Sequence, residues 1–192
     1  MQITLHAPFS NYSWKPESWK ELGFASPEDV AYWEVSSCGI QCLKMAIDGL
    51  LTEEALTLVE YIRKGTEVGA YTHAHGWVHA GLAQLAEHMG VRAYVVESLA
   101  MSQIQALVQD GRFVIISVKS NFSVKKSLKE RLLFWRKYGG HMVLVVGCTN
   151  EGQEGFFVHD TSVRPAHLGV SRFVPMRLFS QSFTGRGVVV YK

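Results

Sequence analysis

Apolar residues in the first half of the chain recur at intervals of three and four, the spacing of an amphipathic helix. Directly after Ser36 and Ser37 this spacing is kept by Ile40, Leu43, Ile47 and Leu50. We therefore predict a helix that begins near Ser36 and carries Cys38 in its first turn. Two more helices are predicted on the same grounds, over residues 52–64 and 77–89.

The second half of the chain has a different pattern. Short runs rich in Val, Ile and aromatic residues alternate there with Gly, Asn and Asp, which is typical of strands joined by turns. Helices followed by strands predict an α+β fold, with N-terminal helices packed on a mostly antiparallel sheet. We see no linker or repeat, so residues 1–192 are predicted to form one domain. The predicted strands cover residues 92–97, 113–119, 142–148, 155–160 and 187–191, and a basic amphipathic helix is predicted within residues 120–140.

Composition narrows the class of protein only modestly. A net charge of +2, from 19 basic and 17 acidic side chains, gives no indication of nucleic-acid binding. No apolar run approaches the roughly 18 residues that a membrane-spanning helix needs. Three cysteines are an odd number and too few for a disulfide scaffold, so we expect a reducing compartment, the cytoplasm. The oligomeric state cannot be read from these features.

Cys38 is the first candidate for chemistry. A cysteine acts as a nucleophile only as the thiolate, and its usual pKa of about 8.5 falls near a helix N-terminus or an imidazolium. Cys38 has the predicted helix start, and Gly39 after it would leave room for a substrate backbone. A helix-start cysteine is more often a buried structural thiol than a nucleophile, so a partner base is needed to strengthen the interpretation.

A predicted β-hairpin supplies that base. The segments Gly139–Gly147 and Gly155–Asp160 flank the turn-forming run TNEGQE. If the turn centres on Asn150 and Glu151, His141 pairs directly with Asp160, and if the register shifts by two, they become diagonal neighbours on one face. In either register the carboxylate can orient the imidazole, as in a catalytic triad.

These residues resemble the bacteriocin-processing (double-glycine leader) peptidase family and its stand-alone relatives. The likeness rests on three motifs, found at residues 38–45 (CGIQCLKM), 139–145 (GGHMVLV) and 159–162 (HDTS). The resemblance implies a papain-like cysteine peptidase fold and a triad of Cys38, His141 and Asp160. It also implies a peptide substrate, with a double-glycine leader as one possibility, and no cofactor.

One departure from the family pattern affects the expected activity. The family carries a Gln five or six residues before the nucleophile, whose amide helps to form the oxyanion hole, whereas this chain has Trp33 and Tyr32 there. Losing one such donor costs about 10²- to 10³-fold in rate elsewhere. The hydroxyl of Tyr32, the indole of Trp33 and the hydroxyls of Ser36 and Ser37 remain as alternatives. As substrate-binding residues we predict Tyr32, Trp33, Gly39, Trp77 and Gly140.

The remaining cysteines and histidines receive structural interpretations. Cys42 and Cys148 are predicted to be small core residues. His73, His75 and His79 invite a zinc hypothesis, but no carboxylate or cysteine completes a set at an established spacing, so we predict no metal site.

The sequence therefore predicts a cysteine peptidase or amidase acting on a peptide or small amide through a Cys38 acyl-enzyme. Two alternatives stay open. The chain could be a peptide-binding module with weak or no catalysis, because of the missing Gln, or an acyl transferase that uses the same triad.

Overall fold

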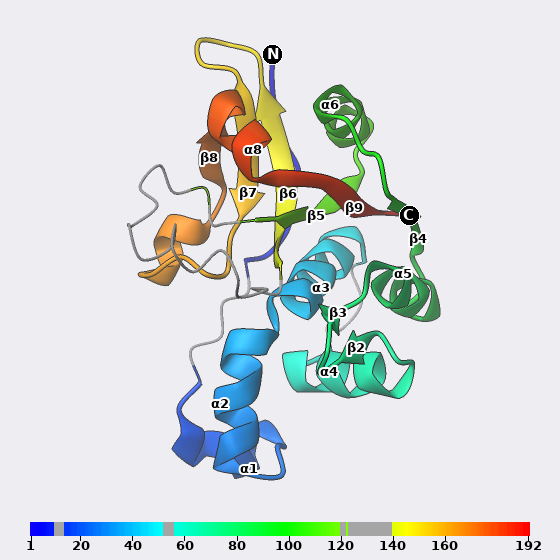
Figure 1. Cartoon of the computed structure of the whole chain (residues 1–192), viewed down its shortest axis with the longest axis vertical. Coiled ribbons are helices and arrows are strands. Elements are labelled where there is room, and N and C mark those ends of the chain that lie inside the picture. Colours follow the sequence, from blue (N-terminus) through cyan, green and yellow to red (C-terminus); the bar gives the residue numbers. More distant parts are fainter. Residues whose placement is uncertain (10–13, 52–55, 120–121, 123–139) are drawn as a thin grey trace.

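A computed structural model describes residues 1–9, 14–51, 56–119, 122 and 140–192. In this part of the chain, seven strands form one sheet in the order β4-β9-β5-β6-β7-β8, with β1 also paired to β6, and every pair is antiparallel (Figure 1). The strands are β1 (Gln2–Thr4), β4 (Arg92–Val96), β5 (Phe113–Val118), β6 (His141–Thr149), β7 (Gly155–His159), β8 (Arg172–Pro175) and β9 (Phe183–Tyr191).

Helices cover both faces of this sheet. The helices α3 and α5 pack on one face, with α4 packed against both of them, and α6 and α8 pack on the other face. The helices are α1 (Trp19–Leu22), α2 (Pro27–Ser36), α3 (Cys38–Leu50), α4 (Leu58–Glu67), α5 (His79–His88), α6 (Met101–Gln109) and α8 (Met176–Ser182), with short 3-10 turns at Pro16–Ser18 and Ala166–Gly169. A small hairpin of β2 (Tyr71–Thr72) and β3 (Gly76–Trp77) lies between α4 and α5.

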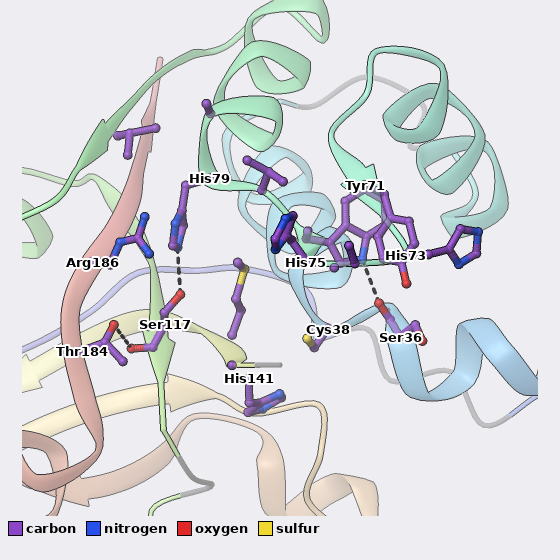
Figure 2. Close-up of a pocket in the computed structure, with 18 of the residues that line it drawn as sticks. Ser36, Cys38, Tyr71, His73, His75, His79, Ser117, His141, Thr184 and Arg186 are labelled. Carbon is purple, nitrogen blue, oxygen red and sulfur yellow. Dashed lines mark hydrogen bonds between the residues drawn. The ribbon is translucent and has the colours of Figure 1, made fainter. Parts of the chain in front are cut away.

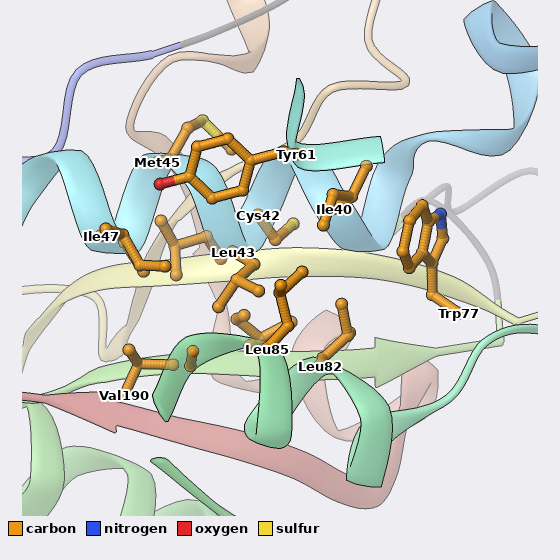
Figure 3. Packing of buried hydrophobic residues seen from close by; sticks show 14 of the residues in the cluster. Ile40, Cys42, Leu43, Met45, Ile47, Tyr61, Trp77, Leu82, Leu85 and Val190 are labelled. Carbon is orange, nitrogen blue, oxygen red and sulfur yellow. The ribbon is translucent and has the colours of Figure 1, made fainter. Parts of the chain in front are cut away.

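The sheet is buried on both sides because its central strands are apolar at nearly every position. In β5, Phe113 and Ile115 pack against the N-terminal helices, whereas Val114 and Ile116 pack toward α6 and α8. Such continuous apolar runs are typical of strands covered on two faces. Figure 3 shows part of the first cluster, which gathers side chains of α3, α4, α5 and the sheet.

The predicted α+β class and the mostly antiparallel sheet are confirmed, as is a helix that carries Cys38 in its first turn. The first four residues of the helix predicted over 52–64 lie outside the described residues, and α4 begins at Leu58. Thr57 caps it, its side chain accepting a hydrogen bond from the backbone N–H of Glu60, while the Glu60 carboxylate accepts one from the N–H of Thr57. Short elements such as β1, β8, α6 and α8 were not predicted.

The prediction that Trp77 starts a helix was wrong. Trp77 pairs with Tyr71 in the β2–β3 hairpin, and α5 begins at His79. Gly76 permits this arrangement, because its φ of +71° lies in the left-handed region that side chains disfavour. The predicted helix within residues 120–140 lies outside the described residues. Among the described helices, none combines the length and the apolar character needed to cross a bilayer.

Candidate active site

Cys38 is the first residue of α3, directly after the junction with α2. The first N–H groups of a helix have no partner inside the helix, so they stabilise a negative charge placed beside them. The Cys38 sulfur is half-buried and receives backbone hydrogen bonds from Gly39 and Met142. Its surroundings therefore favour the thiolate.

His141 is the first residue of β6 and reaches Asp160, which directly follows the neighbouring strand β7. Leu144 pairs with His159, so His141 and Asp160 are diagonal neighbours, the second of the two predicted registers. The Nε2 of His141 lies 2.9 Å from Oδ1 of Asp160. This contact leaves Nδ1 of the same ring for the Cys38 thiol, to which His141 is hydrogen-bonded. The structure thus brings the three predicted groups together.

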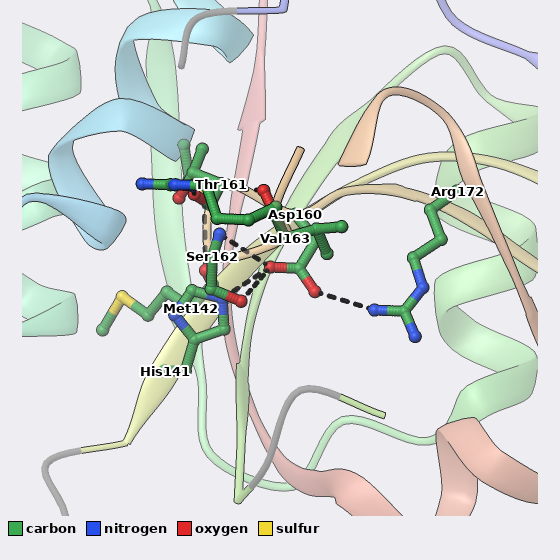
Figure 4. Close-up of polar contacts among 9 residues, drawn as sticks. His141, Met142, Asp160, Thr161, Ser162, Val163 and Arg172 are labelled. Carbon is green, nitrogen blue, oxygen red and sulfur yellow. Dashed lines mark hydrogen bonds and ion pairs between the residues drawn. The ribbon is translucent and has the colours of Figure 1, made fainter. Parts of the chain in front are cut away.

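The carboxylate of Asp160 is fully buried and has hydrogen bonds on both oxygens (Figure 4). Besides His141, its Oδ1 accepts from the backbone N–H of Ser162 at 3.0 Å and from the Ser162 hydroxyl at 2.7 Å. Its Oδ2 accepts from Nη1 of Arg172 at 3.2 Å. A carboxylate held from both sides in this way cannot rotate away from the imidazole.

The electrostatics of the three groups favour an ion pair between Cys38 and His141. Burial acts to raise the pKa of the Cys38 thiol, but the hydrogen bond and charge of His141, with the two backbone N–H groups, outweigh it and lower that pKa. Burial acts to lower the pKa of His141, but Asp160 and Cys38 raise it to about 9. The pKa of Asp160 is lowered, since its hydrogen bonds to His141 and Ser162 outweigh its burial. These opposite shifts of the pKa of Cys38 and of His141 favour a thiolate beside an imidazolium.

A cleft of about 1010 Å³ opens over Cys38 and His141. Figure 2 shows Cys38 and His141 between two groups of lining residues. Tyr71 and His73 lie on one side, together with Ser36, and this end is rich in aromatic rings. The other side is polar and is lined by His79, Ser117, Thr184, Arg186 and Glu97. Cys38 and His141 therefore lie between the two ends of the cleft.

Three of the five predicted substrate-binding residues, Tyr32, Trp77 and Gly140, line this cleft. The other two do not. Trp33 packs against the rings of Tyr71 and Trp77, at 4.8 and 6.0 Å between centroids, as part of the core. Gly39 is buried, and a Cβ built there would lie 2.8 Å from Cβ of Trp77, so its missing side chain makes room for Trp77 and not for a substrate.

The candidate oxyanion-hole donors separate in the same way. The Ser37 hydroxyl is buried and accepts a 2.6 Å hydrogen bond from Nε2 of Gln41. Tyr32 places its hydroxyl in the cleft, hydrogen-bonded to the hydroxyl of Tyr71 and to Nδ1 of His73 at 2.9 Å. Burial, followed by the hydrogen bond with Tyr32, raises the pKa of Tyr71 to about 12, so its hydroxyl stays neutral near neutral pH.

The other cysteines are buried. Cys42 lies against the backbone carbonyl of Met142, 3.6 Å from its sulfur, and Cys148 is buried in β6. Burial raises the pKa of both thiols. Over the described residues, no three His, Cys, Asp or Glu side chains are grouped so that they could hold a metal ion. His79 instead contacts the hydroxyl of Ser117.

Several residues of the site were missed by sequence reasoning. Ser162 and Arg172 fix Asp160, and Tyr71 joins Tyr32, but each lies in a loop or a strand too short to predict. The motif HDTS contained a usable signal for Ser162, because a serine two residues after an aspartate commonly caps its side chain. Arg172 had no local signal in the sequence, because only the pairing of β7 with β8 brings it next to Asp160.

Comparisons with known proteins identify the fold. No protein-family model and no curated protein sequence matches the chain. Among solved structures, a C39-like peptidase from Bacillus anthracis has a TM-score of 0.64 at 15% identity, covering 100% of this chain and 98% of its own. The peptidase domain of Streptococcus ComA, a bifunctional ABC transporter, has a TM-score of 0.53 at 13% sequence identity. The match covers 82% of this chain and 93% of that domain. A double-glycine motif protease from an AMS/PCAT transporter, solved in complex with the leader peptide, has a TM-score of 0.53 at 13% sequence identity. The match covers 100% of this chain and 99% of that protease.

The predicted papain-like fold is therefore confirmed, and so is the resemblance to double-glycine peptidases at the level of fold. The described part of the chain matches these domains over nearly their whole length.

Proposed function

We propose that this protein is a cysteine peptidase, or an amidase of the same mechanism, that forms an acyl-enzyme on Cys38. The observation that carries the proposal is the chain of contacts from Cys38 through His141 to the buried carboxylate of Asp160, 2.9 Å from the imidazole. The shared fold with peptidase domains supports it.

In the proposed reaction, the Cys38 thiolate attacks the carbonyl carbon of the scissile bond and forms a tetrahedral intermediate. The imidazolium of His141 then donates its proton to the departing nitrogen, the C–N bond breaks, and a thioester remains on Cys38. A water molecule attacks this thioester while His141 takes a proton from that water. The carboxylic acid product then leaves and the Cys38 thiolate re-forms. Asp160 keeps the Nε2–H tautomer of His141 throughout.

The oxyanion would be stabilised by the backbone N–H of Cys38 and by the hydroxyl of Tyr32. Tyr32 offers a side-chain hydroxyl in the cleft at the position of the family's Gln, with a second hydroxyl, that of Tyr71, in contact with it. A tyrosine hydroxyl can serve as such a donor when neighbouring groups keep it neutral and directed. Tyr32→Phe should then lower kcat about 10²-fold with KM little changed.

The experiment that tests the proposed function is the pH dependence of Cys38 alkylation by iodoacetamide, followed peptide by peptide with mass spectrometry. Cys42 and Cys148 serve as internal references, because both are buried with raised pKa values. We expect Cys38 to react far faster, with a thiolate pKa well below about 8.5 that rises in His141→Ala. An inert Cys38 that is indifferent to His141 would overturn the proposal.

A peptide-binding module without efficient catalysis is the second candidate, and Tyr32 at the position of the family's Gln favours it. Tight binding of a peptide that is never cleaved, with an unreactive Cys38, would support this function. Acyl transfer is distinguished from hydrolysis by adding an amine or thiol to the reaction and measuring the masses of the products.

A further inference from the structure

The polar end of the cleft is built by four separate segments of the chain and is not used by the proposed triad. We call it the polar subsite and define it as His79 of α5, Ser117 of β5, Glu97, and Thr184 and Arg186 of β9. Figure 2 shows His79 directed at Ser117, with Thr184 and Arg186 beside them, on the side of Cys38 away from Tyr71. All five residues line the same cleft as the nucleophile.

The hydrogen bonds inside the subsite fix its polar groups. Nε2 of His79 lies 2.8 Å from the hydroxyl of Ser117, and the Thr184 hydroxyl donates a 3.0 Å bond to the backbone carbonyl of Ser117. His79 is buried, with 8% of its surface exposed. Burial lowers its pKa, and the nearby charge of Arg186 lowers it further against the opposing effect of Glu97. The imidazole is therefore neutral near neutral pH.

The charges in the subsite cancel. Nε and Nη2 of Arg186 donate to the two carboxylate oxygens of Glu97 at 2.6 and 3.0 Å. Across the described residues, Nη1 of Arg186 has no hydrogen bond, so it can donate to a ligand. The pair lies at the exposed rim of the cleft, with 51% of the Arg186 side chain and 61% of the Glu97 side chain exposed. A cationic ligand group would meet Arg186 and an anionic one would meet Glu97, so the pair offers a net opposite charge to neither.

We propose that the polar subsite binds an uncharged hydrogen-bonding side chain of the substrate, namely that of asparagine or glutamine. The proposal rests on the proposed peptidase function and names its substrate class. A carboxamide has both an acceptor oxygen and donor hydrogens. Its oxygen would accept from Arg186, and its N–H groups would donate to the free lone pairs of Ser117 or Thr184.

Peptide libraries randomised at one position at a time test the proposal with the full-length protein. We expect one substrate position, on one side of the cleaved bond, to show a preference. At that position the wild type should prefer Asn and Gln over Asp, Glu, Lys and Arg by about tenfold in kcat/KM. Glu97→Gln removes the charge that balances Arg186, so the preference at that position should shift to Asp and Glu. The matched control is Glu87→Gln, an exposed carboxylate on α5 outside the cleft lining, which should leave the profile unchanged.

The outcomes separate the two proposals. If the wild type cleaves peptides but shows no carboxamide preference, or if Glu97→Gln leaves the profile unchanged, the polar subsite is wrong and the peptidase function stands. If no peptide is cleaved, the same libraries are selected for binding to Cys38→Ala. Enrichment of Asn and Gln there, lost in Cys38→Ala/Glu97→Gln, supports the subsite in a binding module, and unbiased binding or no binding overturns it.

Discussion

The indole Nε1 of Trp77 donates a 2.8 Å hydrogen bond to the backbone carbonyl of Ser36, two residues before Cys38. Ser36 is the last residue of α2, so this bond ties the β2–β3 hairpin to the junction from which the nucleophile projects. The ring itself is confined by two glycines. A Cβ on Gly39 would lie 2.8 Å from Cβ of Trp77, and one on Gly65 would lie 2.6 Å from its Cζ3.

Trp77→Phe tests this tie. Phenylalanine fills most of the same space but cannot donate to Ser36, so we expect a loss of about 1 kcal/mol in the free energy of unfolding. We also expect slower alkylation of Cys38, because the start of α3 is less well held. Urea denaturation and the alkylation assay measure the two effects. Trp19→Phe on α1 is the control, and equal effects from both variants would contradict the assigned role of Trp77.

Gly65→Ala should destabilise the protein even though alanine is the better helix former. Alanine gains up to about 1 kcal/mol over glycine within a helix, but the added methyl would press on Trp77, and overpacking of this kind costs about 1–3 kcal/mol. Trp77 cannot retreat easily, since Gly39 and the bond to Ser36 fix its other side. Thermal denaturation shows whether Gly65→Ala lowers or raises the stability of the protein. The control is Lys64→Ala, at an exposed position on the same helix. A stabilised Gly65→Ala would show that the ring has room to move.

Asp160→Asn should lower stability in a pH-dependent way. At neutral pH it replaces a buried carboxylate that accepts from His141, Ser162 and Arg172, and we expect a loss of about 1–3 kcal/mol. Because the folded pKa of Asp160 lies below its unfolded value of about 3.9, the wild-type advantage is present above that value and is lost as the pH falls through the folded pKa. The difference from Asp160→Asn should therefore shrink at pH 3. Exposed Asp110→Asn is the control, and a difference that does not depend on pH would argue against an ionised Asp160.

The pH profile of peptide cleavage should fall on the alkaline side near pH 9. His141 must carry a proton to give to the leaving nitrogen, and its pKa is raised to about 9, against its own burial, by Asp160 and Cys38. The activity is therefore present below this pH and is lost as the imidazolium deprotonates. In Asp160→Asn the alkaline limb of kcat/KM should move to lower pH, whereas exposed His88→Asn should leave it in place. An unmoved limb in Asp160→Asn would assign it to another group.

Sequence patterns predicted the parts of the fold whose signals are local. The runs around Val114 and Val143 are apolar enough to mark strands, and the spacing of Ile40 and Leu43 marks the helix after the nucleophile. The start of α5 was misjudged because the left-handed φ of Gly76, which permits the hairpin, looks like an ordinary loop glycine in the sequence.

In the candidate site, too, only the contacts between residues close in sequence were predictable. His141 and Asp160 are joined by one hairpin, so their contact followed from counting residues across a turn. His79 and Ser117 are 38 residues apart on a helix and a strand that are not consecutive, and only the packing of α5 beside the sheet brings them together. The polar subsite therefore required the tertiary structure.

The placement of the reacting groups has a consequence for synthesis of the protein. Cys38 begins a helix in the first quarter of the chain, whereas the imidazole and carboxylate that lower its pKa come from strands more than 100 residues later. While the chain emerges from the ribosome, its thiol lacks these partners and keeps an ordinary pKa near 8.5. Under the proposed function, a reactive thiolate would arise only after β6 and β7 have joined the sheet, so completion of folding would itself activate Cys38.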